Sequence, residues 1–71
     1  MKAYTVEYRV TGREVKQISF LAKNRIDAYD KATFELIPEK EGEMPYSAWV
    51  YSVTYQNGNC KRFDTFEGKP Y

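Results

Sequence analysis

The stretch that decides the fold is residues 3–22, which read AYTVEYRVTGREVKQISFLA. Residues 3–10 alternate between apolar and polar side chains, a pattern that is typical of a half-buried β-strand. Residues 15–22 predict a second strand, and the glycine-containing segment 11–14 between the two predicts a turn. The stretch is therefore predicted to form a β-hairpin, with an apolar side made of Tyr4, Val6, Tyr8 and Val10 on one strand and Ile18, Phe20 and Ala22 on the other.

The length of the hairpin loop determines which residues face each other. A two-residue loop would place apolar residues of one strand beside polar residues of the other, because a shift of one position moves every side chain to the opposite face. A three-residue loop pairs Val6 with Ile18 and keeps each face uniform. We therefore predict an odd loop length, in which Gly12 or Arg13 takes the unusual backbone angles.

A helix is predicted over residues 25–36. Asn24 is its expected N-cap, and Asp27 is the partner of a capping-box variant. Pro38 disfavours helical geometry at the residue before it, so the helix is expected to stop near position 37, and the charged segment that follows is expected to be a loop. Phe34 is expected on the solvent side of the helix, opposite an apolar side made of Ala28, Tyr29, Ala32 and Leu36.

Two further strands are predicted at residues 47–55 and 60–66. Asn57-Gly58 between them is the strongest short hairpin signal and predicts a two-residue type I′ turn. With that turn, one face of the hairpin would carry Trp49, Tyr51, Val53 and Tyr55 together with Cys60, Arg62, Asp64 and Phe66. The other face would carry Ala48, Val50, Ser52 and Thr54 together with Lys61, Phe63, Thr65 and Glu67. We predict that the first face is buried. Because Arg62 and Asp64 on that face are charged, burial of the second face is the alternative.

These elements predict an α+β domain of the ββαββ type, a four-stranded, mostly antiparallel sheet with one helix packed on one face. A right-handed crossover between the second and third strands favours the strand order 2-1-3-4. The length of 71 residues allows one domain over residues 1–71, with residues 67–71 expected to be a frayed tail.

The composition argues against an enzyme. The chain has no His, which removes the commonest general base and a common zinc ligand, and its four glycines are isolated, so no phosphate-binding loop occurs. Cys60 is the only cysteine and cannot form an internal disulfide, which fits a reducing cytoplasm. No stretch predicts a signal peptide or a membrane span. We therefore expect a cytoplasmic protein without catalytic residues, cofactor or metal, which acts through its surfaces.

The leading hypothesis for function is contact with another protein, as an accessory or inhibitor protein of bacterial or mobile-element origin. Apolar side chains are expected on the solvent side of the helix and on the open sheet face. The acidic loop, which is the charged segment 38–45 after the helix, adds negative charge at the negative end of the helix dipole. This charge would attract a basic partner. Exposed edge strands would also allow a homodimer. The predicted interaction surface consists of Phe34, Phe63, Val50, Glu39, Glu41 and Glu43.

A nucleic acid bound on the open sheet face is the alternative, and a structural subunit of a larger assembly is a third hypothesis. The formal net charge of +1 gives no general basic excess for binding phosphates. The acidic loop is also expected at the same end of the molecule as the first turn, where it would partly cancel the basic charge. The predicted nucleic-acid contacts are Arg9, Arg13, Lys16 and Lys61.

Overall fold

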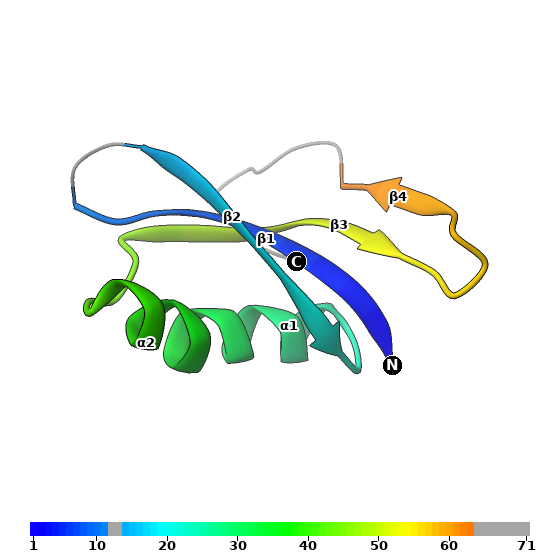
Figure 1. Cartoon of the computed structure of the whole chain (residues 1–71), viewed down its shortest axis with the longest axis horizontal. Coiled ribbons are helices and arrows are strands. Elements are labelled where there is room, and N and C mark those ends of the chain that lie inside the picture. The colour runs from blue at the N-terminus through cyan, green and yellow to red at the C-terminus, as the bar shows by residue number, and fades with distance from the viewer. Residues whose placement is uncertain (12–13, 64–71) are drawn as a thin grey trace.

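The computed structural model describes residues 1–11 and 14–63. The strands are β1 (Lys2–Arg9), β2 (Val15–Ala22), β3 (Ser47–Thr54) and β4 (Cys60–Arg62). One helix lies between β2 and β3 in three parts, α1 (Arg25–Lys31), η1 (Ala32–Leu36) and α2 (Ile37–Glu41). The strands form one antiparallel sheet in the order β2-β1-β3-β4, and the helix covers one of its faces (Figure 1). This confirms the predicted ββαββ architecture and strand order. Residues 67–71, predicted to be a frayed tail, lie outside the described range.

The register of the first hairpin is the one that its pattern predicts. Val6 lies opposite Ile18, and Tyr4 lies opposite Phe20. The apolar residues of both strands therefore share the face that the helix covers. The prediction that Gly12 or Arg13 takes unusual backbone angles falls outside the described residues.

The start of the helix is fixed by two side chains that bond to the backbone. Asn24 Oδ1 accepts a hydrogen bond from the backbone N–H of Asp27 at 2.8 Å, as the N-cap prediction requires. The carboxylate of Asp27 accepts from the backbone N–H of Lys23 at 2.9 Å. The reciprocal bond of this capping arrangement thus reaches one residue further back than in the standard capping box.

The helix does not stop before Pro38, and this prediction was wrong. A proline in an α-helix lacks one N–H, and its ring clashes with the carbonyl four residues earlier. Here the turn before the proline is a π-helix, in which the backbone N–H of Ile37 bonds to the carbonyl of Ala32, five residues back. The wider turn gives the ring room, so the helix continues to Glu41. It ends at Gly42, which has the left-handed φ of 80°.

The prediction that the Trp49 side of β3 is buried was wrong for Trp49 and Tyr51, which are only half-buried, whereas Val53 of that side is buried as predicted. The register between β1 and β3 shifts by one residue, because Thr5 lies opposite Ser52 whereas Val6 lies opposite Val50. Tyr51 is the extra residue of this β-bulge, which changes the face to which the following side chains point. The strand therefore directs alternate residues to the covered face on each side of the bulge, Ala48 and Val50 before it and Val53 after it. Ser52 beside the bulge is buried as well.

The second hairpin has a three-residue loop instead of the predicted two-residue turn. Tyr55 donates its backbone N–H to the carbonyl of Asn59, and Gly58 donates to the carbonyl of Tyr55. Gly58 has a φ of 93°, which fits a turn closed by a left-handed glycine. The pairing partner of Cys60 is consequently Thr54 and not Tyr55, so the side chains of β4 exchange faces relative to the prediction.

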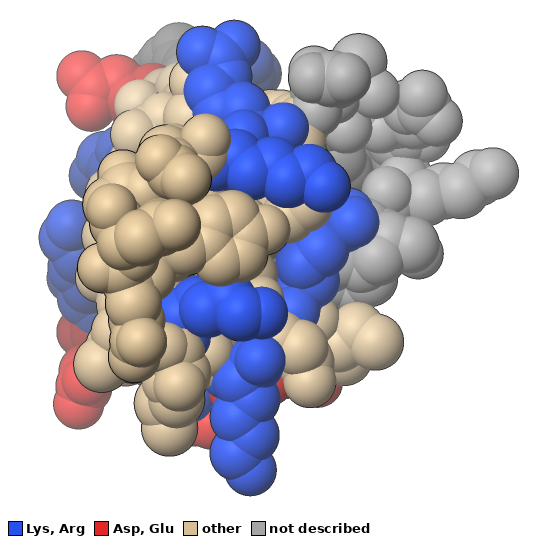
Figure 2. All heavy atoms as spheres, turned by 90° about the vertical axis from the view of Figure 1, so that its right-hand side faces the viewer, with Lys and Arg blue, Asp and Glu red and all other residues tan. Residues whose placement is uncertain are grey.

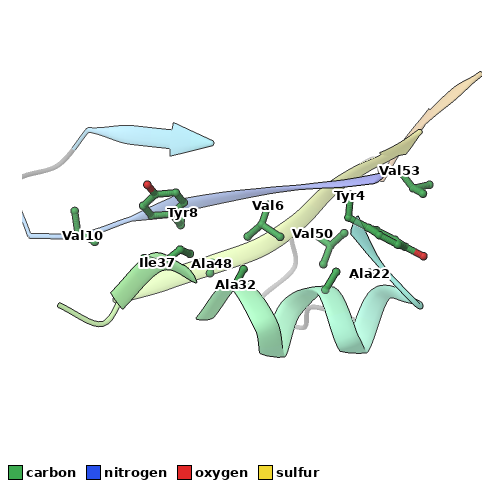
Figure 3. Close-up of a cluster of buried hydrophobic side chains, with 11 residues drawn as sticks. Tyr4, Val6, Tyr8, Val10, Ala22, Ala32, Ile37, Ala48, Val50 and Val53 are labelled. Carbon is green, nitrogen blue, oxygen red and sulfur yellow. The ribbon is translucent and has the colours of Figure 1, made fainter. Parts of the chain in front are cut away.

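The core lies between the sheet and the helix (Figure 3). Tyr4, Val6 and Tyr8 point from β1 toward the helix and are at most 3% exposed. Ala28 and Ala32 are fully buried, and their small side chains let the helix lie close to the sheet. Ile37 is also fully buried and closes the core at the α2 end.

Candidate functional site

The residues of the predicted protein-binding surface do not come together. Phe34 is 60% exposed, as predicted for the solvent side of the helix. Val50, in contrast, is 1% exposed in the core, and Phe63 is half-buried against the core. Both were expected on the open sheet face. The bulge at Tyr51 and the longer second loop place them on the covered face instead.

Glu41 is held in a network at the α2 end of the molecule. The Tyr8 hydroxyl donates to Glu41 Oε2 at 2.7 Å, and Lys16 Nζ donates to Glu41 Oε1 at 3.0 Å. Burial, reinforced by the hydrogen bond to Glu41 and its negative charge, raises the pKa of Tyr8 to about 12. The hydrogen bonds from Tyr8 and Lys16 lower the pKa of the Glu41 carboxyl from its ordinary value. The charge of Glu41 is therefore satisfied within the protein.

The other charged residues predicted as contacts are spread over the molecule. Glu39 is exposed, and Glu43 accepts a hydrogen bond from the hydroxyl of Thr11 at 2.9 Å. The ion pair between Lys16 and Glu41 confirms the predicted partial cancellation of charge at this end. Arg9 is exposed beside the same end, whereas Lys61 lies on the second hairpin. Arg13 lies outside the described residues.

Polar side chains on the open face of the sheet bond to one another. Glu7 accepts hydrogen bonds from Trp49 Nε1 at 3.0 Å and from Gln17 Nε2 at 3.2 Å. The rings of Trp49 and Tyr51 meet edge to face, with centroids 5.6 Å apart. The guanidinium of Arg62 lies 5.3 Å from the centroid of the Tyr51 ring. Some of the polar groups on this face, which the nucleic-acid alternative would offer to bases, are therefore already hydrogen-bonded to neighbours within the sheet.

Sequence reasoning missed a hollow at the opposite end of the molecule, where α1 begins and the second hairpin turns. Its volume is about 460 Å³. The floor is aromatic and aliphatic, and basic side chains stand around it. It is lined by Lys2, Tyr4, Asn24, Arg25, Ile26, Val53, Tyr55, Lys61 and Phe63.

Three cations of this hollow lie against aromatic rings. Lys2 Nζ is 5.8 Å from the centroid of the Tyr55 ring. The Arg25 guanidinium carbon is 4.1 Å from the centroid of the Phe63 ring, and Lys61 Nζ is 5.9 Å from the same centroid. Such contacts stabilise a cation by about 0.5–1 kcal/mol at exposed sites and restrict where it lies. Figure 2, which faces this end, shows basic side chains around an area of uncharged surface, with acidic side chains at the margins. We call this site the basic hollow.

The pairing of three strands brings the basic hollow together. Tyr4 of β1 lies opposite Val53 of β3, which in turn lies opposite Lys61 of β4. Phe63 follows Lys61 by two residues and so falls on the same face. The two-residue turn predicted from Asn57-Gly58 would have placed Lys61 and Phe63 on the other face. A prediction of a three-residue loop ending at Gly58 would have placed Lys61 and Phe63 on the same face as Val53 and could have revealed the site.

Comparison of the chain with known protein families, with curated proteins and with solved structures finds no match. Among residues 1–11 and 14–63, no helix is long and apolar enough to cross a membrane. The same residues contain no group of three or more His, Cys, Asp or Glu side chains that could hold a metal ion.

Proposed function

We propose that the protein is a binding module for single-stranded nucleic acid and that the basic hollow is its site. The observation that carries this proposal is the placement of Lys2, Arg25 and Lys61 against the rings of Tyr55 and Phe63 around one concave surface. Proteins that bind single strands combine a positively charged groove for the phosphates with aromatic rings that stack on the bases. Both components are present here within one hollow.

The size and composition of the hollow support a nucleotide as the unit that is bound. A volume of about 460 Å³ falls within the usual range for sites that take small molecules and cofactors, about 300–1,000 Å³. Tyr55 is 38% exposed, so part of its ring can contact a base. The neighbouring amines of Lys2 and Lys61 can contact the phosphates on either side.

The choice of lysine favours a polyanion over a protein partner at this site. The centres of protein interfaces are enriched in aromatic residues and arginine but depleted in lysine, whereas lysine is common where phosphates are bound as point charges. The net charge of +1 is compatible with this proposal, because the acidic residues of α2 and the segment after it lie at the other end of the molecule. The uneven distribution would orient the protein with its basic end toward the strand.

A protein partner stays a second hypothesis, and a different observation favours it. Phe34 presents 60% of its surface to solvent on the outer side of the helix. Phe34 does not line the basic hollow, and it belongs to the opposite side of the helix from Ala28 and Ala32. Substitution of Phe34 therefore separates the two hypotheses, because it should leave binding of nucleic acid unchanged.

The proposal is tested by fluorescence anisotropy with a labelled, mixed-sequence single strand of about 12 nucleotides. We expect binding that weakens as salt rises from about 20 to 200 mM, with a log–log slope near −2 for about three phosphate contacts. The double variant Lys2→Glu/Lys61→Glu should bind more than about tenfold more weakly, because two favourable contacts become repulsive. Lys40→Glu, at the α2 end, is the control for a charge reversal outside the hollow and should bind nearly as the wild type does.

Phe63→Leu adds a test of stacking, because leucine keeps an apolar side chain against the core but has no π-face. We expect a several-fold loss of affinity with little change in the salt slope. No binding at low salt would overturn the proposal, and so would an equal loss in the Lys40→Glu control. Equally tight binding of poly-glutamate would show that the site takes any anionic chain and would also overturn it.

A further inference from the structure

The two edges of the sheet differ in length and charge. The β4 edge has three residues and includes Lys61 and Arg62, and short, charged edges resist pairing with other strands. The β2 edge has eight residues, and Lys16 is its single charged residue. Lys16 is already in an ion pair with Glu41 of the same chain. A long edge with so little free charge is the kind that pairs with another strand.

The backbone groups that β2 offers outward can be identified. The amine of Lys31 donates to the carbonyl oxygen of Leu21 at 3.3 Å, so this carbonyl points away from β1. Along a strand, the N–H and C=O of one residue point to the same side, and alternate residues share that side. Val15, Gln17, Ser19 and Leu21 therefore direct their backbone groups to the free edge. The carbonyl oxygen of Leu21 has a second lone pair and can accept from another strand as well.

Two exposed apolar side chains stand at the ends of this edge. Val15 is 50% exposed and Leu21 is 59% exposed. They lie six positions apart along the strand and share the open face of the sheet. Ile18, the residue midway between them in the sequence, points to the covered face. An antiparallel copy of β2 centred on Ile18 would place each Val15 opposite the Leu21 of the other copy and would cover both pairs.

We propose that the protein forms a homodimer by antiparallel pairing of β2 with β2 of a second copy, with the two-fold axis at Ile18. The strand is complementary to itself only in this register. An axis at Gln17 or at Ser19 would leave the two apolar residues opposite polar ones, and an axis between residues would join the open face of one copy to the covered face of the other. The dimer has one sheet of eight strands with both helices on the same face. This inference is independent of the proposed function, because β2 contributes nothing to the basic hollow.

Sedimentation equilibrium tests the dimer, from about 10 μM to about 1 mM protein. We expect the mass to rise from that of an 8.4 kDa monomer toward twice that value. Val15→Lys/Leu21→Lys should lower the association constant at least about tenfold, because two pairs of like charges would face each other. Val15→Glu/Leu21→Lys should restore association at low salt, since each introduced carboxylate then faces an introduced amine. Phe34→Lys is the control, because Phe34 is equally exposed but lies on the helix.

Disulfide trapping tests the register directly, on a Cys60→Ser background. The two Ile18 residues would form a pair without backbone hydrogen bonds, with Cα atoms about 4.5 Å apart, which is within disulfide range. Ile18→Cys should therefore form a covalent dimer on oxidation. Leu21→Cys should not, because its two copies would be about 20 Å apart. A monomer at the highest concentration, or equal trapping of both variants, would overturn the proposal.

Discussion

The two ends of the molecule contain the same kinds of side chain in different arrangements. At the α2 end, an aromatic hydroxyl, a lysine and a carboxylate bond together, since Tyr8 and Lys16 both donate to Glu41. At the α1 end, lysines and an arginine lie against the rings of Tyr55 and Phe63 around the basic hollow. In the first arrangement the charges satisfy one another, whereas in the second the cationic groups border a concave surface.

This difference indicates how a chain with almost no net charge can still have a charged site. Glu41 of α2 neutralises Lys16, and Glu43 after it accepts a hydrogen bond from Thr11, both away from the hollow. Stability is therefore expected to depend on the α2 end and binding on the α1 end. The following predictions test that separation, in order of decreasing effect.

The largest effect is expected for Ile37→Ala. Ile37 is fully buried beneath the α2 end, so truncation should leave a cavity and lower the free energy of unfolding by about 2–5 kcal/mol. Ile26→Ala is the matched change at the other end, where the side chain is 60% exposed, and should cost no more than about 0.5 kcal/mol. Urea denaturation of both variants measures this difference. Similar losses in the two would show that the hollow is as much a part of the core as the α2 end.

A smaller effect is expected for Tyr8→Phe, which removes the hydroxyl and leaves the ring. The bond to the charged Glu41 is lost, at a cost of about 1–2 kcal/mol near neutral pH. Because the folded protein raises the pKa of Tyr8 to about 12, its stabilisation is complete below the ordinary value near 10 and is lost as the pH rises toward 12. The variant should lack that part of the alkaline loss. Tyr55→Phe, at the basic hollow, is the control variant, and thermal unfolding followed from pH 7 to about 12 compares the two.

The smallest effect is expected for Glu41→Gln, and it concerns acid. The pKa of Glu41 is lowered in the folded protein, so its stabilisation is present above the pKa of the unfolded chain and is lost as the pH falls through the folded value. At pH values below about 4, the wild-type free energy of unfolding should therefore decrease, and the variant should show a smaller decrease. Glu39→Gln, on the same helix end but with an exposed side chain, is the control. An identical pH dependence of the free energy of unfolding in the wild type and in both variants would mean that ionisation of Glu41 is not coupled to folding.

The first half of the fold could be predicted from the sequence because its pattern is unbroken. The alternation of Tyr4, Val6 and Tyr8 fixes the register of the first hairpin, and Asn24 fixes the start of the helix by a local bond. Neither inference needs knowledge of a distant residue. The same is true of the exposure of Phe34, which follows from helical periodicity.

The second half could not be predicted in the same way, because one extra residue changes the face of every residue after it. The bulge at Tyr51 lets Val50 share the covered face with Val53 and leaves Trp49 on the open face, and periodicity alone shows no difference between a bulged strand and a regular one. The third residue of the Gln56–Gly58 loop does the same to β4. Since Lys61 and Phe63 follow that loop, the basic hollow was missed together with the register.

The π-segment of the helix has a consequence for the length of the chain. Nine positions separate Ala28 from Ile37, one more than the two steps of four residues that an α-helix needs to keep both on one side. The helix thus contains one residue more than its buried side requires, and the exposed Phe34 lies in the part that contains it. A chain shortened by Phe34 would keep Ile37 in line with Ala28 and Ala32, but it would lose the wide turn that makes room for Pro38, at a cost of about 3 kcal/mol. The additional residue and the proline therefore compensate each other, and a chain that lost both could keep the same core in a regular α-helix.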